Sequence, residues 1–91
     1  MEKEIKEEKM LEFRYVIKDE TGLHARPAGM LAKLVRDADC AVTITNGDKS
    51  IDAGKLFAVM GLGIHQGDEV IVSADDEEVL AKLKYFFETY L

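Results

Sequence analysis

Cysteine and tryptophan are nearly missing from this sequence, which has one of the former and none of the latter. The single cysteine, Cys40, rules out an internal disulfide. The sequence also has neither a Cys-x-x-Cys pair nor the cysteine spacing of a thiolate metal site. Because free thiols are typical of reducing compartments, we predict a cytoplasmic protein.

Long apolar runs and an excess of positive charge are missing too. A membrane-spanning helix needs about 20 consecutive apolar residues, and no run in this sequence approaches that length. The formal net charge is -6, which argues against broad binding to nucleic acid or to an anionic membrane. We therefore expect no nucleic-acid partner and no direct insertion into a membrane.

The features of a small-molecule enzyme are missing as well. The sequence has no cofactor-binding loop and no paired catalytic carboxylates, and its 91 residues are too few for a deep pocket. Its two histidines, His24 and His65, have no further residues at metal-ligand spacing beside them, and we interpret His65 as a surface loop residue. We predict a protein that is not a free-standing enzyme and that uses neither metal nor cofactor.

The residues that are present organise into one domain. Residues 1–10 are mostly Glu and Lys and are interpreted as a charged N-terminal extension, and residues 11–91 form the domain. Alternating or β-branched apolar residues predict strands at 11–17, 40–45 and 69–74, and the hairpin signal Asn46-Gly47 predicts a returning strand at 49–52. Helical spacing and capping residues predict a helix from near Ala25 and a last helix from an N-cap at Asp75 to the chain end. Periodicity does not settle so short an apolar run as residues 55–60, but Gly61 and Gly63 after it are consistent with a short helix that glycine ends.

The order of these elements predicts the fold class. The sequence β-α-β-β-α-β-α in so short a chain favours an α+β fold, with one antiparallel sheet and the helices packed on one face. The alternation places Cys40 on the inward side of its strand, and it places Arg14, Thr43 and Thr45 on the solvent side of the sheet.

A histidine at a helix start marks the candidate functional site. His24 precedes a predicted helix, and Arg26 lies two residues further on. A helix start offers unpaired N–H groups and the positive end of the dipole, which together favour a bound anion. A neutral imidazole is also a nucleophile near neutral pH. A lone histidine in this place is more often a surface cap, so position alone leaves both interpretations open.

The residues around His24 decide between them. Gly22-Leu23-His24-Ala25-Arg26-Pro27-Ala28 resembles, residue for residue, the active-site signature of HPr, the histidine-containing phosphocarrier of the bacterial phosphotransferase system. The resemblance extends over Asn46-Gly47, residues 55–64 and the turn at residues 66–69. It implies an open-faced β-sandwich, in which three helices cover one face of a four-stranded antiparallel sheet.

The resemblance also implies the site and the partners. His24 would accept a phosphoryl group on Nδ1 from enzyme I, which takes it from phosphoenolpyruvate, and would pass it to the IIA unit of a sugar permease. Arg26 would neutralise and orient the phosphate, with Ala25 and Pro27 completing the phosphate-binding residues at the helix start. The partner-docking face would consist of Met30, Lys33, Arg36, Leu56, Phe57 and Met60.

One position departs from the family pattern. In many Gram-positive members the short helix opens with a serine that a kinase phosphorylates, and here that position is Lys55. Lysine cannot serve as that switch, so regulation through this position is not expected. Two alternatives to sugar transport stay open, namely a phosphorylated regulatory module that acts on transcriptional or metabolic regulators, and an adaptor that is never phosphorylated. We expect a monomer, because a shuttle must free its docking face after each transfer.

Overall fold

The computed structural model describes residues 11–91, and its elements follow the predicted order. The strands are β1 Leu11–Val16, β2 Val42–Asn46, β3 Lys49–Asp52 and β4 Glu69–Ala74. The helices are α1 Ala25–Ala38, α2 Leu56–Gly61 and α3 Glu77–Tyr90. The charged extension predicted at residues 1–10 lies outside the described residues.

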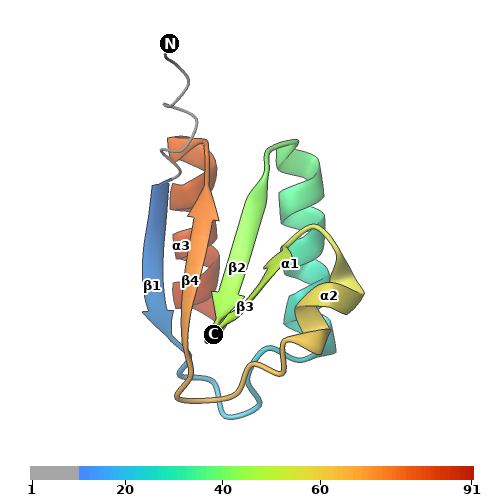
Figure 1. The fold of residues 1–91 in the computed structure, drawn as a ribbon, viewed down its shortest axis with the longest axis vertical. Helices are drawn as coiled ribbons and strands as arrows, with labels where there is room; N and C mark the ends of the chain where they lie inside the picture. The colour runs from blue at the N-terminus through green and yellow to red at the C-terminus, as the bar shows by residue number, and fades with distance from the viewer. Residues whose placement is uncertain (1–10) are drawn as a thin grey trace.

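The four strands form one antiparallel sheet in the order β1-β4-β2-β3. Helices α1 and α3 lie side by side against one face, and α2 packs beside α1 near the β3 edge (Figure 1). The predicted open-faced sandwich with its helices on one face is confirmed. Because α1 and α3 run in opposite directions, the start of α1 and the end of α3 meet at the same end of the molecule (Figure 1).

The core lies between the sheet and these helices. Ile44 aligns with Val72 of β4 and with Ile51 of β3, and Phe87 of α3 meets Phe13 and Tyr15 edge-on at ring distances of 5.8 and 5.6 Å. Such edge-to-face pairs add to the free energy of apolar burial. No polar or charged side chain is buried within residues 11–91, so any polar chemistry of this region takes place at its surface.

Cys40 differs from its predicted position. Strand β2 begins at Val42, so Cys40 lies before the strand and not on its inward side. Its half-buried thiol donates a hydrogen bond to Oδ1 of Asp75 at 3.0 Å. Burial is the largest cause that raises the pKa of the Cys40 thiol, and this hydrogen bond to a carboxylate is the next largest. The thiol therefore keeps its proton near neutral pH.

The start of the last helix also differs by one residue. The N-cap of α3 is Asp76, whose carboxylate accepts hydrogen bonds from the amides of Glu78 and Val79 at 2.8 and 3.1 Å. The predicted cap, Asp75, instead accepts the Cys40 thiol. Two adjacent aspartates are equal candidates by sequence, and the contact with Cys40 separates them.

Within the described residues, no helix is long and apolar enough to cross a membrane.

Candidate functional site

The chain segment that leads into α1 is held by a close backbone contact. Gly22 has a φ of +74°, and a Cβ on it would lie 2.5 Å from the carbonyl oxygen of Ile64. The neighbouring amide of Leu23 donates to that same oxygen at 3.2 Å, and the Leu23 side chain is buried. Only glycine fits this approach without strain. The contact fixes the segment immediately before His24.

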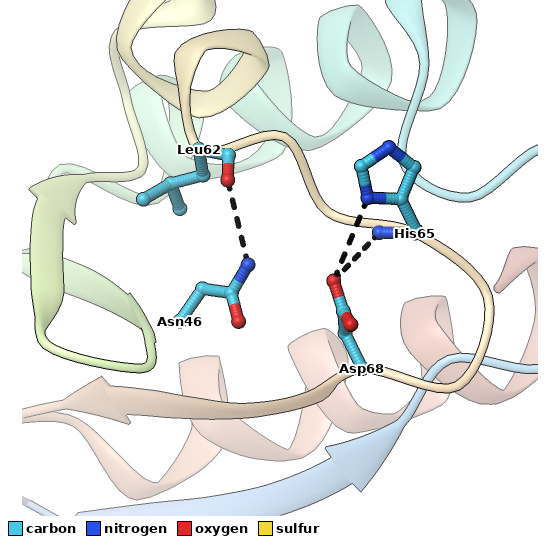
Figure 2. A network of polar contacts seen from close by, with 4 residues as sticks. All are labelled: Asn46, Leu62, His65 and Asp68. Carbon is cyan, nitrogen blue, oxygen red and sulfur yellow. Dashed lines mark hydrogen bonds and ion pairs between the residues drawn. The ribbon is translucent and has the colours of Figure 1, made fainter.

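The loop that carries Ile64 is itself well supported, as Figure 2 shows. The side-chain amide of Asn46 donates to the carbonyl oxygen of Leu62 at 3.4 Å. Oδ2 of Asp68 accepts the backbone amide of His65 at 2.9 Å and lies 3.9 Å from Nδ1 of His65. His65 is exposed, which confirms its prediction as a surface loop residue. These contacts brace the loop against which Gly22 and Leu23 rest.

His24 occupies the N-cap of α1, as predicted. Its backbone is extended, with φ -97° and ψ -170°, and its carbonyl oxygen accepts the amide of Ala28 at 2.9 Å. The His24 side chain makes no capping hydrogen bond and is exposed. The amides of Ala25 and Arg26 precede the first bond of the helix and so have no intrahelical acceptor. An imidazole free to react therefore lies beside two unused helix-end donors.

A hollow of about 380 Å³ lies next to His24. It is lined by His24, Arg26, Pro27, Met30 and Tyr90. Arg26 is exposed, whereas Pro27 is buried under the first turn of the helix. With the helix dipole and the forked guanidinium on one side, the hollow suits a phosphate-sized anion. Of the three predicted phosphate-binding residues, Arg26 and Pro27 thus line the hollow with His24, whereas Ala25 does not.

Tyr90 is the residue of this hollow that the sequence did not predict. The apolar spacing of the last helix marks Tyr90 only as part of a buried face. Its place beside His24 depends on the antiparallel packing of α1 and α3, which brings the two ends of the domain together (Figure 1). No local pattern in the sequence signals that meeting.

The predicted docking residues of α1 lie along an exposed face. Nζ of Lys33 forms an ion pair with Oδ2 of Asp37 at 2.7 Å, and this pairing lowers the pKa of the Asp37 carboxyl. Arg36 donates to the carbonyl oxygen of Gly54 at 3.4 Å, just before α2. Met30 is partly exposed and lines the hollow described above. Lys33 is thus paired with an aspartate of its own helix, while Arg36 links α1 to the segment just before α2.

The predicted docking residues of α2 differ in exposure. Phe57 is 83% exposed and Met60 is 39% exposed, whereas Leu56 is half-buried and packs against the core. Lys55 is the exposed N-cap of α2 and, having no acceptor oxygen, makes no side-chain capping bond. An exposed phenylalanine beside a methionine is a typical contact surface for another protein. The assignment of the docking face as a whole stays a prediction.

A family model described as the PTS HPr component phosphorylation site matches residues 11–89 of this chain. The chain belongs to the HPr family. HPr proteins are phosphocarriers of the phosphotransferase system, so phosphoryl transfer in that system is the role of the family. The family is one of carriers and not of classical enzymes, and it works with other components of the same system.

Individual relatives agree with this assignment. The phosphocarrier protein HPr of Chlamydia pneumoniae is 31% identical over 77 residues, which cover 81% of this chain and 71% of that protein. The phosphocarrier protein HPr of Streptomyces coelicolor is 38% identical over 64 residues, which cover 69% of each chain. The crystal structure of HPr-C-His from Thermoanaerobacter tengcongensis matches with a TM-score of 0.82 at 32% identity and covers 88% of this chain and 93% of that chain.

Proposed function

We propose that this HPr-family protein accepts a phosphoryl group on Nδ1 of His24 from enzyme I and passes it to IIA components of sugar permeases. The observation that carries this proposal is the exposed, uncapped imidazole of His24 beside the free amides of Ala25 and Arg26. In the first step Nδ1 attacks phosphorus, a P–N bond forms, and the bond to the donor breaks. In the second step a group of IIA attacks phosphorus, a bond between phosphorus and IIA forms, and the P–Nδ1 bond to His24 breaks.

The helix start favours the phosphorylated form of His24. A negative group at a helix N-terminus gains about 0.3–1 kcal/mol from the dipole. The amides of Ala25 and Arg26 add hydrogen bonds, and the Arg26 guanidinium can bind two phosphoryl oxygens at once. Together these donors hold the phosphoryl group in one orientation, which a transfer between two proteins requires.

The exposed side chains of α1 and α2 are the proposed docking face. Phe57 and Met60 supply an apolar centre, and Arg36 and Lys55 add positive charge beside it. Asp39 and Asp52 line the same groove as Arg36 and Lys55, so the positive charge comes from these two side chains and not from the groove as a whole. Partners with an acidic rim around an apolar patch would fit this face, and their approach would be oriented by charge.

Labelling by enzyme I tests this proposal. The protein is incubated with enzyme I and labelled phosphoenolpyruvate, and the expected product is an acid-labile phosphohistidine. His24→Ala should abolish the label, and His65→Ala is the matched control that should retain it. Absence of label, or label that survives His24→Ala, would contradict the proposal.

A second function is favoured by Lys55, which replaces the regulatory serine of many Gram-positive members. In this alternative the protein is phosphorylated on His24 but acts as a regulatory module and not in sugar uptake. Mixing the phosphorylated protein with IIA components separates the two functions. A carrier loses its label to IIA, whereas a dead-end regulator keeps it.

A further inference from the structure

Tyr90 lines the same hollow as His24, although it belongs to the opposite end of the domain. The hollow has walls from the first turns of α1, formed by Arg26, Pro27 and Met30, and from the last turn of α3, formed by Tyr90. Tyr90 is 48% exposed, so part of its surface is buried against the protein and part faces solvent. An aromatic ring therefore borders the same hollow as the His24 side chain.

The position of Tyr90 is fixed by its neighbours. Its ring lies 5.0 Å from that of Phe86, which is buried in the core. The next residue, Leu91, is buried. Its backbone oxygen accepts hydrogen bonds from the amides of Lys18 and Asp19 at 2.6 and 2.8 Å. The end of α3 is thus fastened to the segment that leads to His24. The Tyr90 ring thus packs against a core aromatic ring at a helix end that backbone hydrogen bonds hold in place.

We infer that the ring of Tyr90 acts as a wall that shields phosphorylated His24 from water and so lengthens the lifetime of the phosphohistidine. This inference rests on the proposed function of His24. Arg26 lies on one side of the hollow, where its guanidinium would bind phosphoryl oxygens, whereas Pro27, Met30 and Tyr90 give the rest of the lining an apolar character. Water near that lining has few groups to hydrogen-bond, which lowers its local occupancy.

The reaction that the wall opposes is hydrolysis. The oxygen of a water molecule forms a bond to phosphorus, and the P–Nδ1 bond breaks. Nδ1 keeps the electron pair of that bond and takes a proton from the water, and hydrogen phosphate leaves. Excluding water from a reactive intermediate is an established way for proteins to suppress such a side reaction. A carrier benefits directly, because a phosphoryl group lost to water never reaches its acceptor.

Decay of the phosphorylated protein tests this role. Native protein and the variants Tyr90→Ala, Tyr90→Phe and Tyr85→Ala are labelled with enzyme I and phosphoenolpyruvate, enzyme I is removed, and loss of the acid-labile label is followed at neutral pH. Tyr85 is the matched control because it is a tyrosine of the same helix, 71% exposed, that lines the neighbouring groove between α1 and α3 and not the His24 hollow. Circular dichroism verifies that each variant is folded.

We expect Tyr90→Ala to shorten the half-life of the phosphohistidine by about threefold or more. Tyr90→Phe keeps the ring and should match the native protein, and Tyr85→Ala should also match it. An unchanged half-life in Tyr90→Ala, or equal acceleration by Tyr85→Ala, would overturn the inference. Acceleration by Tyr90→Phe would overturn it too, since the hydroxyl and not the ring would then protect the phosphate. A protein that enzyme I never labels would refute the proposed function itself, whereas labelled variants that decay alike would refute only the role of Tyr90.

Discussion

At the scale of single residues, Gly22 shapes the backbone just before His24, the proposed phosphoryl acceptor. The positive φ of Gly22 and its close approach to Ile64 leave no room for a Cβ. Gly29, in the middle of α1, has no atom within 4 Å of its would-be Cβ. Two glycines of one short stretch therefore have opposite tolerance for a methyl group.

Gly22→Ala should lower the free energy of unfolding by about 2 kcal/mol or more, because it combines a left-handed backbone with a backbone clash. Gly29→Ala, the matched control, should raise it by about 0.5–1 kcal/mol, because alanine loses less chain entropy in a helix. Urea unfolding followed by circular dichroism measures both values. Equal effects of the same sign would contradict the close contact at Gly22.

Arg26 offers a test of phosphate recognition without a cost in stability. Its side chain is exposed, so Arg26→Ala should leave the unfolding free energy within about 0.5 kcal/mol of native. In Arg26→Ala the rate of phosphoryl transfer from phosphorylated enzyme I should fall about tenfold or more. The rate of Arg26→Lys should lie between those of Arg26→Ala and the native protein, since lysine keeps the charge but not the forked donors. Rapid-quench kinetics gives these rates. An Arg26→Ala variant as fast as the native protein would exclude a role in binding the phosphate.

At the scale of the elements, the start of α3 depends on one of two adjacent aspartates. Asp76→Ala should lower the unfolding free energy by about 0.5–2 kcal/mol, because the amides of Glu78 and Val79 lose their acceptor. Asp75→Ala is the control, and it should cost less because the Asp75 carboxylate accepts a hydrogen bond from the half-buried Cys40 thiol and caps no helix amide. Chemical denaturation of the two variants compares them. A larger loss for Asp75→Ala would reverse the assignment of the cap.

Helix α2 presents the most exposed aromatic side chain of the described residues on the proposed docking face. Phe57→Ala should weaken the binding of enzyme I about tenfold, because an aromatic anchor at the centre of an interface carries much of the binding energy. Its stability should change by less than about 0.5 kcal/mol, since Phe57 is 83% exposed. Isothermal titration calorimetry measures the affinity. Val16 is an exposed apolar residue on β1, and Val16→Ala is the control that should bind enzyme I with native affinity. An equal loss of affinity in Val16→Ala would show that the effect at Phe57 is not local.

The elements also show how far the sequence alone leads. Apolar periodicity, the Asn46-Gly47 hairpin signal and the glycines after the short helix together predict the strands and helices to within about two residues. The same pattern cannot distinguish Asp75 from Asp76 or place Cys40, because those details depend on a contact between segments far apart in the chain. The start of α1 could be predicted because the motif that forms it is continuous, with His24, Arg26 and Pro27 close together.

At the scale of the whole molecule, the sheet acts as a scaffold that brings distant segments to one end. Helices α1 and α3 run antiparallel (Figure 1). Their packing places Tyr90 and His24 in the lining of one hollow, and the loop before β4 contacts the segment of Gly22 and Leu23. The composition of this chain gives no sign of either meeting, since both arise only when the helices pack on the sheet. The residues at the start of α1 can therefore be predicted from the sequence, because they form one continuous motif. The contribution of Tyr90 from α3 cannot.

The most direct test of the central claim, that His24 carries the phosphoryl group at the start of α1, is a nuclear magnetic resonance comparison of the ¹⁵N-labelled protein before and after reaction with enzyme I and phosphoenolpyruvate. We expect phosphorylation of Nδ1 of His24, the largest amide shifts at Ala25 and Arg26, and an unchanged His65 ring. A phosphoryl group on Nε2 or on His65, or no phosphorylated histidine, would contradict it.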